Sequence, residues 1–261
     1  MFSQQPRCLY RKNQLDKVIC QLRFSEILSI ETNLPADFQE AIRDEFPQYL
    51  CQKETPAPKL VGTPGNLHME KQPPCNNYHF ISADGVWRVN LTSKFISFAC
   101  SKYTCWEDFA RKLDKPLAAF IKIYKPAFFE RLGLRYVNLI SRENLELADV
   151  PYRDLINSCW LGPIAEEDVL ESAATRSAVD SEISIRGGCR VKIHAGPVLV
   201  NRGGKTEPEP KFAFDQDLFM TGKIPVNYSA GSLETLHNQA YPIFRGAITN
   251  MLHEAMEPES I

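Results

Sequence analysis

Two strand-like stretches, VICQLRFSEILSI at residues 18–30 and RLGLRYVNLI at residues 131–140, place polar side chains among apolar ones. In a strand, alternate residues face opposite sides of the sheet. Gln21 and Arg23 therefore share one face of the first stretch, and Arg135 lies on the same face as Gly133 in the second. A buried arginine needs a carboxylate or a wet cavity, so these positions bear on what the sheet does.

The first stretch leads into further strands and a long helix. Prolines predict a loop over residues 52–77, and alternating apolar residues predict a meander of antiparallel strands over residues 78–103. Apolar residues spaced by three and four then run from Trp106 to Tyr124 and predict an amphipathic helix, which Pro116 should kink.

The second stretch starts a similar series. Strands are predicted over residues 173–185 and 190–200 and in FAFDQDLFM at residues 212–220, followed by a helix over about 232–256 that contains Pro242. The predicted fold class is α+β, a largely antiparallel twisted sheet in two loosely related halves. Each half has a long proline-kinked helix packed on the sheet, as in ferredoxin-like or helix-grip-like folds.

The length of 261 residues fits one large domain or two smaller ones. The repeated pattern places an N-terminal α+β half at residues 1–141 and a C-terminal half at residues 142–261. One continuous domain is the alternative, because strands of the two halves can pair. Similarity between the halves is too low to establish a duplication.

The composition excludes some classes of protein. Apolar residues at 44% and charged residues at 24% are ordinary globular values, and a net charge of −2 argues against a uniformly basic nucleic-acid-binding surface. The eight cysteines are scattered without the spacing of a zinc site, and the start of the chain has no apolar secretory segment. We therefore expect a cytoplasmic protein with reduced thiols, no membrane segment and no cofactor.

No catalytic motif is recognisable, so the sequence assigns no catalytic residue. The first candidate site is a ligand- or partner-binding face formed by Gln21, Arg23, Arg135 and Asn138. In the alternative, each arginine pairs with a carboxylate across the sheet and Asn138 caps a bulge. Only the positions of the two arginines in space can decide between them.

Two further groups of residues are candidates for charged ligands. Asp215 and Asp217 share a strand face and could hold a divalent cation, although alternating charge is also common on a solvated sheet face. Five basic residues surround glycine-rich turns and could form one basic end that contacts phosphate or nucleic acid. They are Arg186, Arg190, Lys192, Arg202 and Lys205. Hairpin tips are the alternative use of these turns.

Several motifs occur in a characteristic order, namely QLRF, LPADFQEAIRDEFP, LGLRYVNLI, FAFDQDLF and EAMEP. In this order the chain resembles a sporadically distributed bacterial family to which no activity is assigned. The resemblance implies a bacterial protein of patchy occurrence, and such proteins often serve phage defence or other conflict systems. It supplies no functional residues.

The leading functional hypothesis is a non-enzymatic recognition or accessory subunit in such a locus, acting through a protein partner encoded nearby. One alternative is a metal-dependent enzyme that processes nucleic acid with Asp215 and Asp217. Another is a sensor of small anions that uses Arg23 and Arg135. The oligomeric state is not predicted.

Overall fold

A computed structural model describes residues 2–55, 58–63 and 66–260 of the chain. The fold class is α+β, as predicted. The main strands are β2 (Leu15–Arg23), β3 (Gln48–Glu54), β6 (Cys75–Ile81), β7 (Trp87–Leu91), β8 (Phe95–Cys100), β9 (Phe129–Ile140), β10 (Val179–Ser184), β11 (Arg190–Val198) and β14 (Lys211–Ile224). They form one sheet in the order β10-β11-β14-β9-β2-β8-β7-β6-β3, and every neighbouring pair is antiparallel.

Helices and short strand pairs complete the fold. The α-helices are α1 (Leu28–Thr32), α2 (Ala36–Ile42), α3 (Trp106–Tyr124), α4 (Tyr152–Leu155), α5 (Ser229–Ala247) and α6 (Asn250–Ala255). Single 3-10 turns occur at η1 (Ser158–Trp160), η2 (Gly162–Ala165), η3 (Glu171–Ala173), η4 (Arg186–Gly188) and η5 (Val226–Tyr228). The two-stranded pairs are β1 (Cys8–Tyr10) with β15 (Pro258–Ser260), β4 (Lys59–Thr63) with β5 (Asn66–Glu70), and β12 (Asn201–Arg202) with β13 (Lys205–Thr206).

The chain traces the same path twice. After β2, the strands β3, β6, β7 and β8 form a meander whose last strand returns beside β2, and α3 follows. After β9, the strands β10, β11 and β14 do the same, and α5 follows. The first strands of the two series, β2 and β9, pair at the centre of the sheet. The second series therefore begins at β9, before the expected boundary at residues 141/142, and one sheet crosses that boundary because β9 also pairs with β14.

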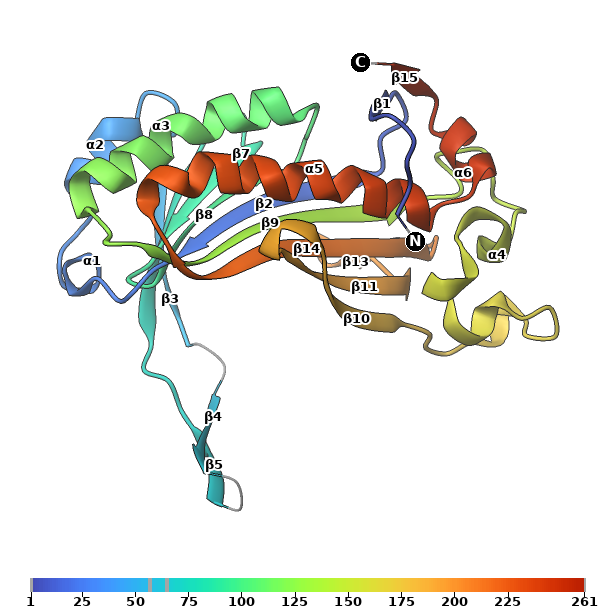
Figure 1. Ribbon diagram of the computed structural model, residues 1–261, viewed down its shortest axis with the longest axis horizontal. Coiled ribbons are helices and arrows are strands. Elements are labelled where there is room, and N and C mark those ends of the chain that lie inside the picture. The colour runs from blue at the N-terminus through green and yellow to red at the C-terminus, as the bar shows by residue number, and fades with distance from the viewer. Residues whose placement is uncertain (1, 56–57, 64–65, 261) are drawn as a thin grey trace.

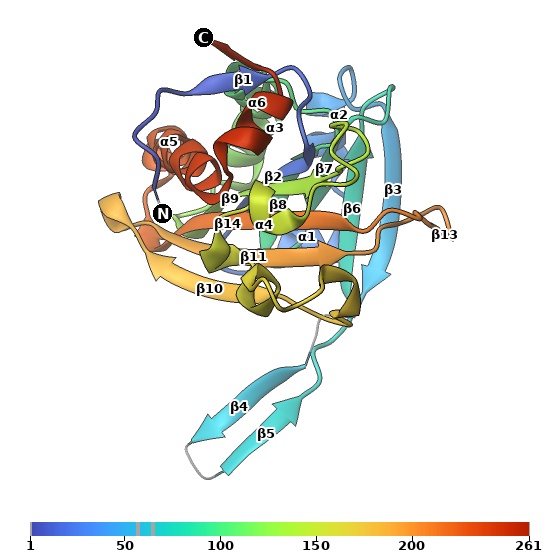
Figure 2. The same cartoon turned by 90° about the vertical axis from the view of Figure 1, so that its right-hand side faces the viewer.

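The long helices α3 and α5 lie side by side on one face of the sheet, which curls around them (Figures 1 and 2). The core forms between the helices and this face. Alternate strand residues such as Val18, Leu134 and Phe214 are fully buried, as are Phe109 of α3 and Leu236 of α5. Both helices contain the predicted prolines. No helix in the described residues is long and apolar enough to span a membrane.

Two sequence-based expectations were wrong. The last helix ends at Ala247, because Ile248 adopts an extended conformation and forms a bridge with Ile156. The Thr249 side chain then accepts a hydrogen bond from the Leu252 amide and starts α6.

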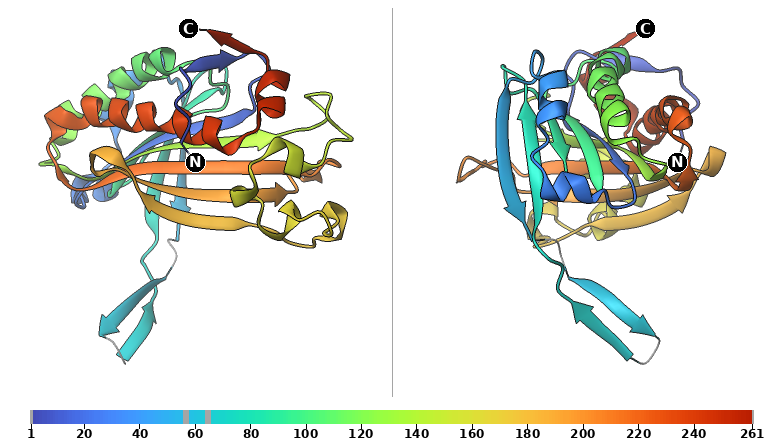
Figure 3. Two further views of the ribbon diagram at one scale, coloured as in Figure 1. Left: turned by 45° about the vertical axis from the view of Figure 1, so that its right-hand side comes forward. Right: turned by 90° about the vertical axis from the view of Figure 1, so that its left-hand side faces the viewer.

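The expected loop over residues 52–77 instead contains the end of β3, the hairpin β4-β5 and the start of β6. The hairpin projects from the sheet on the side away from the long helices (Figure 3). Its side chains of known exposure are all solvent-exposed, including Leu67 and Met69, which alternate with polar residues in β5. This alternation does not mark a buried face, and the nearby prolines predicted a loop instead.

Candidate functional site

The face of the sheet opposite α3 and α5 carries most of the predicted site residues, and we call it the open face. Strand alternation places Gln21 and Arg23 of β2 on this face, whereas Val18, Cys20 and Leu22 point into the core. The same alternation brings Arg135 of β9 and both aspartates of β14 to the open face. Both long helices lie on the opposite face of the sheet (Figure 1).

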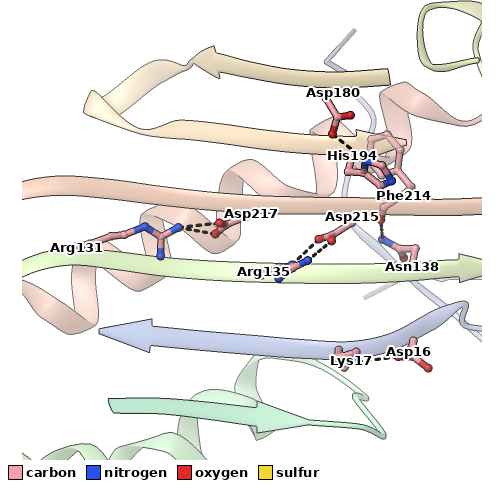
Figure 4. Close-up of polar contacts among 10 residues, drawn as sticks. All are labelled: Asp16, Lys17, Arg131, Arg135, Asn138, Asp180, His194, Phe214, Asp215 and Asp217. Carbon is pink, nitrogen blue, oxygen red and sulfur yellow. Dashed lines mark hydrogen bonds and ion pairs between the residues drawn. The ribbon is translucent and has the colours of Figure 1, made fainter. Parts of the chain in front are cut away.

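Ion pairs link β9 and β14 along the open face (Figure 4). The Arg135 Nε donates to Asp215 Oδ1 at 2.7 Å, and its Nη2 also contacts Asp215 Oδ2. Arg131 Nη2 donates to both carboxylate oxygens of Asp217 at 2.8 Å each. The hydrogen bond to Asp215 raises the pKa of Arg135. Each aspartate therefore accepts hydrogen bonds from its own guanidinium group, and such charge-assisted hydrogen bonds are strong.

A glycine makes the second ion pair possible. Asp217 lies opposite Arg135 in the strand register, so Arg131 must reach along β9 toward Arg135 to contact it. Its guanidinium passes over Gly133, where an added Cβ would lie only 2.2 Å from Arg131 Nη1. Gly133 has no left-handed backbone angle. Glycine is therefore needed at position 133 to leave room for the Arg131 side chain, and not because of the backbone conformation there.

The ion pairs continue toward the sheet edge at β10. His194 Nδ1 lies 2.7 Å from Asp180 Oδ1, and Glu182 contacts both Arg190 and Lys192 of β11. The ring of Phe219, only 4% exposed, lies beneath several cations, with the Arg131 guanidinium carbon 4.7 Å from its centroid. At this end of the open face, charged side chains therefore cover the Phe219 ring and shield it from water.

Two hollows indent the open face and meet at its centre. One, of about 450 Å³, lies over β10, β11 and β14, and the other, of about 350 Å³, lies over β2, β6, β7 and β8. Both are lined by Arg135 and Asp217. Gln21 lines the second hollow. The structure thus brings Gln21, Arg135 and the aspartates to one accessible surface.

Arg23 differs from Arg131 and Arg135 of the open face. Its side chain is exposed at the end of β2, and it forms no ion pair within residues 2–55, 58–63 and 66–260. In the register of the sheet it stands directly opposite Arg131. Like charges in opposed positions repel. At this end of the open face, Arg23 therefore carries a positive charge that no carboxylate pairs within the described residues. Arg135, by contrast, pairs with Asp215 across the strands, as the structural alternative predicted.

Asn138 does not belong to the open face. Its side chain is on the helix-covered side, 3% exposed, and its Nδ2 donates to the Phe214 carbonyl at 3.1 Å (Figure 4). Grouping it with Gln21 and the arginines was wrong, because Asn138 is three positions from Arg135, and strand residues an odd number of positions apart face opposite sides of the sheet.

The five basic residues of the glycine-rich turns are not brought together as one basic end. Arg186 precedes β11, and Arg202 and Lys205 follow it, so the length of the strand, roughly 26 Å at 3.3 Å per residue, separates them. The turn of β12 and β13 projects at the far end of the sheet (Figure 2). Arg202 contacts Asp16 at 2.6 Å and Glu207 at 2.9 Å.

The two aspartates are poorly arranged for a divalent cation. Their carboxylates are occupied by Arg135 and Arg131, whose positive charges oppose cation binding. Among the described residues there is no group of three or more histidine, cysteine, aspartate or glutamate side chains that could hold a metal ion. All eight cysteines lie in the described part of the chain and are free.

Several residues of the open face were missed by sequence reasoning. They are Arg131, Asp180, Glu182 and His194. The alternation of Val179, Ser181 and Ile183 with charged residues was a signal that could have placed Asp180 and Glu182 on a polar face. The pairing of Arg131 with Asp217 left no such signal, because it depends on the register between β9 and β14.

No protein-family model, curated protein or solved structure matches the chain. The geometry of the open face is therefore the basis for the function proposed below.

Proposed function

We propose that this protein is a non-enzymatic recognition subunit that binds a protein partner through the open face. The observation that carries the proposal is a large sheet with both long helices on one face and a network of paired charges on the other. The resemblance to a sporadically distributed bacterial family supports a role in a defence or other conflict locus. The partner is then encoded near the gene for this chain.

The ion pairs of the open face favour recognition because they hold its side chains in place before binding. Long side chains that are already ordered lose little conformational entropy when a partner arrives. Arg135 is fixed by a bidentate contact to Asp215, and Arg131 is fixed through its Nη2, which donates to both carboxylate oxygens of Asp217. Such a surface offers a fixed pattern of charge, and charge complementarity gives specificity and speeds association.

Arg23 is the anchor that we assign to an acidic group of the partner. It is exposed, opposed by Arg131, and unpaired within the described residues. A partner carboxylate at this position would supply the counter-charge that Arg23 lacks and would form a charge-assisted hydrogen bond with its guanidinium group.

Co-purification with the products of the flanking genes tests this proposal. The wild-type chain should form a complex, and Arg23→Glu should weaken the complex at least about tenfold, since reversal turns attraction into repulsion. Arg111→Glu is the matched control, because Arg111 is an exposed arginine of α3 on the other side of the sheet. Equal binding by Arg23→Glu and wild type, or no complex with any flanking product, contradicts the proposal.

The rival function is metal-dependent cleavage of nucleic acid by Asp215 and Asp217. We expect no cleavage when the pure protein is incubated with labelled single- and double-stranded DNA and RNA in the presence of magnesium or manganese. The arginine contacts of both carboxylates are the reason. Cleavage that is lost in Asp215→Asn would overturn the recognition proposal.

Small-anion sensing at Arg23 and Arg135 is the third hypothesis, and the uncompensated charge at Arg23 is the observation that favours it. Sulfate and phosphate would then raise the melting temperature of the wild-type chain but not of Arg23→Ala. An equal effect on both proteins would assign any rise to general salt stabilisation.

A further inference from the structure

A cavity of about 90 Å³ lies on the other side of the sheet, between the core face of β9 and β14 and helix α5. Residues 3–12, here called the strap, cross over it, and Arg7 and Tyr10 contribute to its lining. One water needs only about 10 to 15 Å³ of such space. The cavity is therefore large enough for a small organic molecule or for several waters.

The floor of the cavity holds an unsatisfied acceptor. Gln216 is on β14 between Asp215 and Asp217, but its side chain faces the core side and is 2% exposed. Its Oε1 has no hydrogen-bond partner among the described residues, and Gln216 lines the cavity. A buried acceptor without a donor destabilises a fold. This oxygen is satisfied when a donor occupies the cavity.

The walls of the cavity supply hydroxyl donors and aromatic surface but no net charge. Tyr10, Tyr103 and Tyr241 line it together with Phe244. The charge of Arg7 at the rim is matched by Glu107, 3.2 Å away.

The one histidine in the lining, His237, is uncharged at neutral pH. Arg7 Nη1 lies 3.0 Å from His237 Nε2, and because a guanidinium can only donate, Nε2 must be the acceptor. The ring proton is then on Nδ1, which donates to the Tyr136 hydroxyl at 2.8 Å. The ring of Trp106 stacks on the imidazole at 4.6 Å and keeps water from it. Burial, followed by the nearby Arg7 charge, lowers the pKa of His237 to about 4.

The strap is tied down at several points around the cavity. The Ser3 amide donates to the Pro242 carbonyl at 2.9 Å, and the Tyr10 hydroxyl lies 2.8 Å from His253 Nδ1. Strand β1 of the strap pairs with β15 beside α6, as Figure 2 shows. No side chain of the strap is fully buried, so the strap can open at a lower cost than the sheet or α5.

We propose that this cavity is a binding site for a small, planar, uncharged molecule that has an N–H donor beside a carbonyl acceptor, as in amides, lactams and nucleobases. The N–H bonds Gln216 Oε1, the carbonyl accepts from a tyrosine hydroxyl, and the flat ring lies against the aromatic walls. The strap is the cover through which the ligand enters. Nothing in this proposal depends on the open face or on its partner.

Titration of the isotope-labelled full chain with 2-pyridone, followed by NMR, tests the site. We expect saturable shifts of the Gln216 side-chain amide. N-methyl-2-pyridone has no donor and should not bind, whereas its isomer 5-methyl-2-pyridone has the same added volume but keeps the donor and should bind. No saturable shift with 2-pyridone, or equal binding of N-methyl-2-pyridone and 5-methyl-2-pyridone, overturns the proposal.

Gln216→Met removes the acceptor while nearly preserving the side-chain volume, and it should weaken 2-pyridone binding at least about tenfold. Gln52→Met, at an exposed position of β3, is the matched control and should bind as the wild type does. Amide hydrogen exchange of β1 should slow when the ligand is bound, because the strap is then held closed. Binding by Gln216→Met with wild-type affinity overturns the site, and unchanged exchange in β1 overturns the strap as its cover.

Discussion

The role of Gly133 can be tested by a substitution that acts through one other residue. A Cβ at this position would meet three atoms of the Arg131 guanidinium at 2.2 to 3.1 Å as its nearest neighbours. Because the backbone of Gly133 suits any residue, Gly133→Ala should leave the strand intact and displace only Arg131. The ion pair with Asp217 should be lost, and the stability of the protein should fall.

The size of the effect follows from burial. The side chains of Arg131 and Asp217 are 19% and 28% exposed, so their hydrogen bonds are worth more than those of an exposed pair, about 1.5 to 3 kcal/mol. Alanine is favoured over glycine inside a strand by about 0.5 to 1 kcal/mol. The net expectation for Gly133→Ala is a loss of about 1 to 2 kcal/mol. In an Arg131→Ala background the clash is absent, and the same change should stabilise by about 0.5 to 1 kcal/mol.

Urea unfolding of the wild type, the two single variants and the double variant measures the coupling. We expect an interaction free energy of about 1.5 to 3 kcal/mol with an unchanged dependence on urea. Gly231→Ala is the control, because an added Cβ there meets no atom within 4 Å, and its effect should add to that of Arg131→Ala. If Gly133→Ala lowers the free energy of unfolding by the same amount in the wild-type and the Arg131→Ala backgrounds, the proposed path of the Arg131 side chain is wrong.

Three further outcomes are expected. Phe109→Ala, at a fully buried position of α3, should lower the free energy of unfolding by about 3 to 5 kcal/mol. Phe2→Ala, at a 43% exposed position, should leave stability in thermal or urea unfolding almost unchanged. Burial lowers the pKa of His237 to about 4, below its unfolded value of about 6.5. The contribution of neutral His237 to the free energy of unfolding is therefore fully present above pH 6.5 and is lost as the pH falls toward 4. That loss is about 3 kcal/mol, and His237→Gln should lack this part of the pH dependence in urea unfolding; an identical pH profile would contradict the assignment. Burial raises the pKa of the Cys20 thiol to about 12, so a thiol reagent should modify exposed Cys51 in the folded protein and leave Cys20 unreacted until the chain unfolds.

The sequence alone was sufficient for the fold class and for the alternation within each central strand. Period-two alternation placed Arg23 and Arg135 each opposite the apolar face of its own strand, and helical spacing located α3 and most of α5 with their prolines. Local patterns of this kind survive because burial of one face is a requirement that each strand or helix must meet by itself. In the hairpin β4-β5, Leu67 and Met69 alternate with polar residues but are exposed, so the pattern there does not mark a buried face and the nearby prolines favoured a loop.

The pairing of charges was decided by tertiary structure. The same alternation that places Asp215 and Asp217 on the open face is compatible with a metal site, a solvated face or ion pairs. The register of β14 against β9 brings a guanidinium to each carboxylate, and the absence of a side chain at Gly133 lets Arg131 reach its partner. Register is a property of two strands distant in sequence, so neither strand encodes it alone.

The cavity beneath the strap was also invisible in the sequence. Gln216 occupies a core-facing position within FAFDQDLF, where a polar residue breaks the apolar pattern. That break was present in the sequence, but its meaning depends on the strap, α5 and two central strands, which come together from both ends of the chain. Local burial patterns thus determined which faces are apolar. Only the assembled fold decided where polar groups on those faces meet, because that depends on contacts between segments far apart in the sequence.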